Sequence, residues 1–263
     1  MLIKSEHIQT RSVVPSKLMN RVPEITLFFW FIKMMATTVG ETAADFLSFN
    51  LRMGLTNTTY VMATLLIIAL IIQFKLRRYV PAIYWLVVVL ISIVGTLITD
   101  NLVDNLHVSL LTTMLVFAAA LTAVFILWYK IEKTLSMHTI NNVKRELFYW
   151  VAVLFTFALG TSTGDLVAEY YHMGYAFSAL IFMLAILVLT LSYYRFRMNE
   201  VLAFWMIYIL TRPLGASIGD MLAQPTKLGG LGFGTLHTSA VFFSLIVMMI
   251  AYLTVHQDKR LTK

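Results

Sequence analysis

The sequence predicts an all-α polytopic membrane protein with eight transmembrane helices, built from four tandem two-span repeats in parallel orientation. Three observations lead to this fold class. The 263-residue chain is 59% hydrophobic and 13% charged, against roughly 25% charged residues in ordinary soluble domains. The pattern W-x9-G-x4-D occurs four times, and most Lys and Arg residues fall on alternate connections between apolar segments. We expect the repeats to be pseudo-symmetric about an axis near the membrane normal.

Each copy of the pattern lies inside an apolar run. The tryptophans are Trp30, Trp85, Trp150 and Trp205, the glycines are Gly40, Gly95, Gly160 and Gly215, and the aspartates are Asp45, Asp100, Asp165 and Asp220. A fixed internal spacing indicates structural repeats. The copies start 55, 65 and 55 residues apart, so the first pair maps onto the second at an offset of 120. This spacing suggests that a two-span unit was duplicated twice.

Hydrophobic runs place the spans near 24–48, 58–75, 81–103, 108–130, 146–168, 174–193, 200–222 and 234–255. Val22-Pro23-Glu24 is expected to open the first helix and Pro81 the third, because proline is tolerated at a helix start. The Gly- and Pro-containing stretch 223–233 predicts an irregular loop.

The remaining segments organise the chain around these spans. Residues 1–22 form a basic leader without the apolar core of a signal peptide. Repeats one and two then occupy 23–130, a polar surface linker 131–145, repeats three and four 146–256, and a short tail 257–263.

The distribution of basic residues predicts the orientation. Sixteen Lys and Arg residues fall on the side that holds the leader, the linker and the tail, and two, Arg52 and Lys227, on the other. The positive-inside rule therefore predicts that both termini lie in the cytoplasm. Since each repeat contributes two spans, all four enter the membrane in the same direction.

Composition limits the chemistry. The chain has no cysteine, which excludes disulfides and thiolate metal sites. Any bound metal would need carboxylate, imidazole, hydroxyl or carbonyl ligands. We expect no bound cofactor. We also expect no nucleic-acid partner, although the net charge is +7. The expected partners are the lipid bilayer, a small cation and protons, and the chain could also form a homo-oligomer.

A polar stripe follows one face of each odd-numbered span. Positions 7, 11, 15 and 19 after each tryptophan are four residues apart and lie along one helix face. The stripe carries seven acids, all candidates for cation binding: Glu41, Asp45, Asp100, Asp104, Asp165, Glu169 and Asp220. A carboxylate at membrane depth costs about 3 kcal/mol on insertion scales, so these groups should line a protected cavity. We expect Glu41, Asp45, Asp165 and Glu169 to be the principal metal ligands, since they form the pairs of the two matching repeats.

Arg212 occupies the stripe in the fourth repeat, near the middle of its span. Asp220 lies eight residues away, about 12 Å along a straight helix, which is too far for direct contact. Its charge partner should therefore come from another helix, and Glu41 is the best candidate because repeat four lacks an acid at the corresponding position.

Basic residues also recur seven positions after each aspartate: Arg52, His107, His172 and Lys227. His107 and His172 are candidates for an outer gate because histidine titrates near neutral pH. Interfacial anchoring is the alternative for all four. The tryptophans predict an aromatic belt at the interface. The frame glycines predict close helix packing, with a helix break as the alternative.

The chain resembles a family of bacterial membrane proteins built from four tandem repeats, known as the domain-of-unknown-function 347 repeat. The resemblance covers about residues 22–255, through the four tryptophans with their glycine and aspartate partners, and is especially clear in VPEITLFFW and TTVGETAAD. It implies the repeat architecture and a bacterial inner membrane. It implies no activity, so function must be inferred from the residues.

Three functions compete. The first, which we favour, is transport of a cation, most plausibly a divalent metal ion exchanged for protons. The second is a membrane scaffold in which Arg212 and Lys33 pair with the acids to hold helices together. The third is an intramembrane aspartyl-type hydrolase, suggested by Gly164-Asp165 and Gly219-Asp220. The G-x-G-D form of that motif is absent, because the residues run T-S-T-G-D and A-S-I-G-D. We therefore expect no enzymatic activity.

Overall fold

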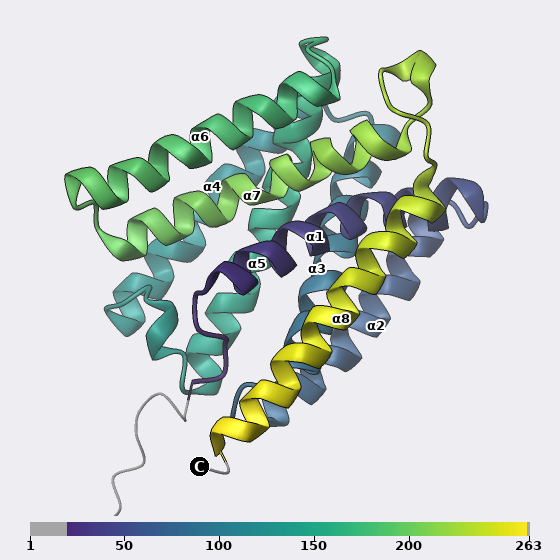
Figure 1. The fold of residues 1–263 in the computed structure, drawn as a ribbon. Helices are drawn as coiled ribbons and strands as arrows, with labels where there is room; N and C mark the ends of the chain where they lie inside the picture. Colours follow the sequence, from purple (N-terminus) through teal and green to yellow (C-terminus); the bar gives the residue numbers. More distant parts are fainter. Residues whose placement is uncertain (1–19, 262–263) are drawn as a thin grey trace, which may run out of the picture.

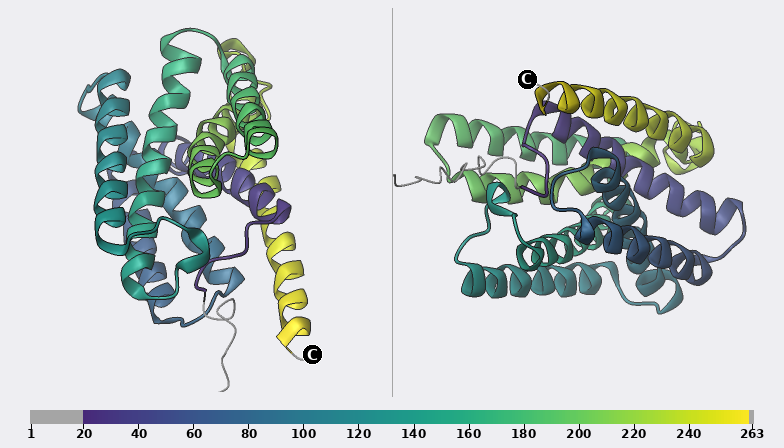
Figure 2. Two further views of the ribbon diagram at one scale, coloured as in Figure 1. Left: turned by 90° about the vertical axis from the view of Figure 1, so that its left-hand side faces the viewer. Right: turned by 90° about the horizontal axis from the view of Figure 1, so that it is seen from below.

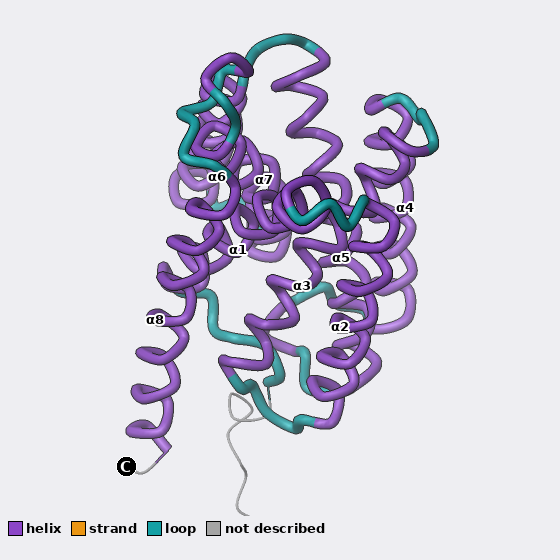
Figure 3. The backbone as a smooth tube through the Cα atoms, turned by 90° about the vertical axis from the view of Figure 1, so that its right-hand side faces the viewer, coloured by secondary structure: helices purple, strands orange, loops and turns teal. Residues whose placement is uncertain are grey.

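The computed structural model describes residues 20–261, and helices account for nearly all of this part of the chain, which contains no strand (Figures 1 and 3). The long helices are α1 (Leu27–Asp45), α2 (Leu55–Lys75), α3 (Pro81–Asp100), α4 (Leu110–Glu132), α5 (Val143–Asp165), α6 (Tyr175–Phe196), α7 (Glu200–Ala223) and α8 (Thr235–Leu261). They match the predicted spans to within a few residues at most ends.

The start of α1 differs from the prediction. The side chain of Thr26 accepts a hydrogen bond from the backbone N–H of Phe29 at 3.3 Å, and this capping interaction begins the helix at Leu27. Val22-Pro23-Glu24 therefore precedes the helix and does not open it.

Three of the four repeats continue past their aspartate in a π-helical turn, which the sequence did not predict. The turns are η2 (Phe46–Asn50), η3 (Asn101–Asn105) and η5 (Leu166–Tyr170). Each turn ends close to a residue with left-handed backbone: Arg52, His107 and His172 have φ of 56°, 54° and 54°. In the fourth repeat α7 ends at Ala223, and a loop with the short 3-10 helix η6 (Thr226–Leu228) follows.

The four odd-numbered helices form a central ring. Helix α1 packs against α3 and α7, and α5 packs against the same two helices. The even-numbered helices lie outside this ring: α2 packs on α3, α4 on α5, α6 on α7 and α8 on α1 (Figure 2). The second helix of each repeat therefore packs on the ring helix of the following repeat. The second helix of the last repeat, α8, packs on the ring helix of the first.

The frame glycines fit between neighbouring helices of the ring. A methyl group added to any of them would overlap the residue at position 7 of the next repeat, in the pairs Gly40–Ser92, Gly95–Phe157, Gly160–Arg212 and Gly215–Thr37. The four helices run without a break through these glycines. The close-packing interpretation is thus confirmed, and the helix-break alternative is wrong.

Seven of the described helices are long and apolar enough to cross a membrane, and α1 is the long helix outside this group. Helix α1 carries Lys33, Glu41 and Asp45, and the first two side chains are buried inside the bundle. The outer helices bury at most 28% of their apolar windows, whereas α3, α5 and α7 bury 61–78%. The exposed apolar faces of the outer helices are those that a bilayer would cover.

Two sequence predictions about the surface are wrong. Trp85, Trp150 and Trp205 do not form an interfacial belt, because each is at most 4% exposed and packs among buried aromatic rings. The 131–145 linker is not wholly at the surface, since Met137 and Ile140 are buried in the core and α5 begins at Val143. Residues 1–19 of the predicted leader and 262–263 of the tail lie outside the described residues.

The two ends of the bundle differ in what they hold. The described chain begins and finishes at the same end (Figure 1), which is called the terminal end. The aspartates of the four repeats lie toward the other end, which is called the cavity end.

Candidate functional site

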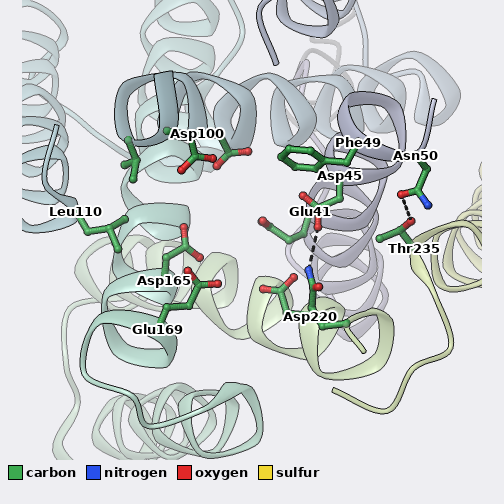
Figure 4. A pocket seen from close by; sticks show the side chains of 13 residues that line it. Glu41, Asp45, Phe49, Asn50, Asp100, Leu110, Asp165, Glu169, Asp220 and Thr235 are labelled. Atoms are coloured by element: carbon green, nitrogen blue, oxygen red, sulfur yellow. Dashed lines mark hydrogen bonds between the residues drawn. The ribbon is translucent and has the colours of Figure 1, made fainter. Parts of the chain in front are cut away.

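A cavity of about 380 Å³ lies at the cavity end of the ring. Positions 15 and 19 of every repeat line it, namely Asp45, Phe49, Asp100, Asp104, Asp165, Glu169, Asp220 and Gln224, together with Glu41, Asn50, Val103, Leu110 and Thr235. The seven predicted acids therefore share one cavity, and the carboxylates of the six that Figure 4 labels point toward the common space. The predicted stripe is confirmed, and it includes Asp104 and Glu169, which lie in π-helical turns.

Three of the carboxylates lie closer together than the others. One carboxylate oxygen from each of Glu41, Asp165 and Asp220 lies within 4.8 Å of the other two. These residues come from α1, α5 and α7. This group differs from the four expected ligands, because it includes Asp220 but not Asp45 or Glu169. The ring geometry accounts for the difference. Acids from three neighbouring helices can meet at one depth, whereas the two acids of a pair on one helix are separated by about 6 Å along its axis.

Arg212 lies behind the cavity lining, where it contacts Glu41. Its guanidinium Nη2 lies 2.7 Å from the Glu41 carboxylate, and the arginine side chain is fully buried. The same nitrogen donates to the hydroxyls of Thr161, at 2.8 Å, and Thr96. The predicted Arg212–Glu41 ion pair is therefore confirmed as a contact between α7 and α1.

The other cavity acids are less tightly held. Asp45 accepts a hydrogen bond of 3.2 Å from the Gln224 amide, and Glu169 accepts one of 3.2 Å from the Tyr175 hydroxyl. Within the described part of the chain, Glu41 alone among the seven acids has a basic side chain at ion-pair distance. The six remaining acids are thus available to a ligand.

Lys33 does not pair with an acid, contrary to the scaffold hypothesis. Its ammonium donates to the Thr211 hydroxyl at 2.7 Å and lies 3.9 Å from the centre of the Tyr208 ring. It also lies 5.0 Å from the centre of the Phe157 ring, so its charge is stabilised by aromatic faces. Lys33 is fully buried, and it shares the Phe157 ring with the Arg212 guanidinium.

The predicted gate histidines lie outside the cavity lining. His107 and His172 are exposed and occupy the left-handed turn position also held by Arg52. All three residues stand two positions after the end of a π-helical turn, so their shared spacing follows from a repeated backbone turn. Lys227 lies in η6 of the fourth repeat. A role of the histidines in gating stays a prediction.

A family model for the Repeat of Unknown Function (DUF347) matches the chain four times, at residues 28–79, 83–134, 148–199 and 203–258. The chain belongs to this family. Each match covers most of one ring helix and the outer helix that follows it, which is complete in the first three matches and lacks its last residues in the fourth. No curated protein and no solved structure matches the chain.

Some features of this DUF347 protein were not predicted from its sequence. The left-handed turns could have been predicted from the sequence. In repeats one to three, a residue suited to begin a helix stands nine positions after the aspartate, so the chain must turn between the two. Gly54, Ser109 and Gly174 begin the outer helices there. The approach of Asp220 to Glu41 and Asp165 had no such signal, because it depends on how three helices cross.

Proposed function

We propose that this DUF347 protein is a membrane transporter that moves a divalent metal ion through the carboxylate-lined cavity in exchange for protons. The observation that carries the proposal is the grouping of seven acids around one cavity in which a single basic side chain offsets a single acid. No bond is made or broken in the proposed reaction. The protein works in the cytoplasmic membrane, with eight spans and its terminal end in the cytoplasm.

Electrostatics supports a cation as the cargo. Two charged carboxylate oxygens about 4.8 Å apart repel each other by roughly 3–4 kcal/mol at an effective dielectric constant of about 20. A divalent cation between them replaces this repulsion by attraction, and bound protons also relieve it. The cavity can therefore hold either a cation or protons, which is the property that an exchanger requires.

The ligand chemistry narrows the class of cation. The cavity offers carboxylate, amide and hydroxyl oxygens but no imidazole or sulfur. Oxygen-only sites suit hard ions such as Mg²⁺, Ca²⁺ and Mn²⁺. Glu41, Asp165 and Asp220 are the proposed central ligands. Asp45, Asp100, Asp104 and Glu169 surround them and attract the hydrated ion.

The contacts of the acids favour a transporter over the scaffold. Acids that hold helices together would need basic or hydrogen-bonding partners at depth, since an unpaired buried charge is strongly destabilising. Glu41 meets this requirement through Arg212. Asp45 and Glu169 each accept a single hydrogen bond. All six other acids line the cavity without a basic partner in the described part of the chain, which is the arrangement expected of ligands.

Flux measurements on purified protein in proteoliposomes test the proposal. The vesicles enclose a pH-sensitive dye, and Mg²⁺, Ca²⁺, Mn²⁺, Co²⁺, Ni²⁺ or Zn²⁺ is added outside. We expect at least one hard cation to enter and drive protons outward, and the Asp165→Asn/Asp220→Asn variant to lose both fluxes. Glu132→Gln removes an acid outside the cavity and should keep them. Equal cation entry in the double variant and the natural protein would contradict the proposal.

A further inference from the structure

The central ring is closed between the cavity and the terminal end. Below Arg212 the stripe continues through two buried layers, Lys33, Val88, Val153 and Tyr208, then Phe29, Tyr84, Tyr149 and Phe204, none more than 6% exposed. These layers contain no carboxylate that could replace the water around a cation. A cation that reaches the cavity can pass the ring only if these layers part.

A short segment before α1 ties together the terminal end. The backbone N–H of Arg21 donates to the carbonyl of Ile140 at 2.9 Å, and that of Tyr79 donates to the carbonyl of Asn20 at 3.1 Å. The Asn20 amide also donates to the carbonyl of Met137 at 3.0 Å. Residues 20–22, called the strap below, thus connect the α2–α3 turn with the α4–α5 linker.

The strap also carries a buried charge into the bundle. Arg21 Nη1 lies 2.7 Å from Glu146 at the start of α5, and the two side chains are 10% and 0% exposed. The Gln73 amide, near the end of α2, donates to the other Glu146 oxygen at 2.7 Å. Arg21 also donates to the carbonyl of Phe74 at 3.4 Å. Three parts of the chain therefore meet at Glu146.

Glu146 lies one helical turn from the contact that joins α3 and α5. The hydroxyls of Tyr84 and Tyr149 are 2.5 Å apart and buried, in the last layer of the ring. Tyr84 follows the α2–α3 turn that the strap holds, and Tyr149 lies on the same helix as Glu146. The strap and the tyrosine pair thus hold the same two helices together.

A buried ion pair suits a contact that must open and close. In the dry state, loss of one partner strands the other charge, so the pair holds firmly. When the layers part and water enters, both charges are hydrated again. This hydration offsets most of the free energy lost when the two charges separate. The strap lies outside the helices, so it can leave Glu146 without unwinding one.

We propose that the strap is an inner latch: Arg21 holds Glu146 while the cavity is open at its own end, and releases it when the terminal ends of α3 and α5 part to let the cargo through. This inference rests on the proposed transport function and assigns its inner gate. It makes Arg21 and Glu146 positioning residues, since neither lies in the cavity lining.

Cysteine accessibility tests the latch without reference to the cargo. The chain has no natural cysteine, so Val153→Cys places a single thiol in a buried layer of α5. Proteoliposomes are treated with a membrane-impermeant thiol reagent on the terminal side. We expect Arg21→Gln to raise the labelling rate roughly ten-fold, the population change that a loss of about 1.4 kcal/mol produces. Glu146→Gln should act in the same direction.

Arg145, the residue before Glu146, provides a matched control for Arg21→Gln. Arg145 pairs with Glu132 at 2.8 Å on the same end of the bundle, so Arg145→Gln removes an equal charge and should leave the labelling rate unchanged. Unchanged labelling in folded Arg21→Gln protein would overturn the latch and leave the strap as a structural tie. Transport can still occur in that case, so the two proposals fail separately.

A second experiment covers variants that fold poorly. A cysteine pair at Asn20 and Met137, whose side chain and carbonyl already touch, can lock the strap by oxidation. We expect oxidation to stop cation flux and reduction to restore it, with cation binding to the cavity retained throughout. Full flux in the oxidised protein would also overturn the latch.

Discussion

Arg212 of α7 and Glu41 of α1 form a buried ion pair between residues 171 positions apart in the sequence. The first prediction concerns its stability. Arg212→Met keeps the stem that packs on Gly160 but strands the Glu41 charge, which should cost about 3–5 kcal/mol of unfolding free energy. Adding Glu41→Gln should recover a large part of this loss. Unfolding in mixed micelles, followed by helical circular dichroism, measures both changes, and additive effects of the two changes would contradict the pairing.

The second prediction concerns the glycines of the ring. A Cβ at Gly95 would lie 2.7 Å from Phe157 Cβ and 3.2 Å from the backbone nitrogen of Ala158. Because neither atom can move freely, Gly95→Ala should lower the unfolding free energy by about 1–3 kcal/mol. Gly164→Ala is the matched control, since its nearest neighbour would lie at 3.6 Å. Similar stabilities for the two variants, measured in the same micelles, would show that α3 and α5 can separate at little cost.

The third prediction ranks the cavity acids. Asp220 is buried and belongs to the group of three close carboxylates, whereas Asp104 is exposed at the rim. Asp220→Asn should weaken cation binding roughly ten-fold or more, and Asp104→Asn only a few-fold, because solvent screens a distant charge. Titration calorimetry with Mn²⁺ and Mg²⁺ measures the two affinities. Equal losses would mean that the ion stays hydrated and senses only the total charge.

The fourth prediction concerns topology. Single cysteines are introduced at Asn141, in the linker, and at Leu51, beyond η2, because both are exposed. An impermeant thiol reagent added to intact cells should label position 51 and spare position 141. Gly54 is unsuitable for this purpose, since its φ of 75° disfavours any side chain. Labelling of position 141 from outside would reverse the orientation.

The sequence predicted the features that depend on periodic spacing. Hydrophobic runs gave the helices, and the fixed distance from tryptophan to aspartate placed Asp45, Asp100, Asp165 and Asp220 around one cavity. The need to neutralise a buried arginine predicted one contact between helices. Arg212 required an acidic partner, and Glu41 lies at the same depth on another helix. Each of these inferences uses only the position of a residue along its own helix.

Features that depend on the crossing of helices could not be predicted in this way. The close approach of Asp220 to Glu41 and Asp165 requires the orientation of three helices. Lys33 lies against the faces of Tyr208 and Phe157, although a buried charge in isolation suggests an acidic partner. Arg21 reaches Glu146 across 125 positions, from a segment whose composition predicted only a basic leader.

The circular order of the outer helices bears on how the protein is made. In the proposed eight-span arrangement, α1 is synthesised before α7, which pairs with Glu41, and before α8, which covers α1. Until then the charged groups of α1 have no partner from the fourth repeat, and the helix is not apolar enough to favour the bilayer by itself. In that arrangement ring closure is the final step of assembly. We expect a chain that stops before its fourth repeat to lack this step and to expose residues that the four-repeat chain buries.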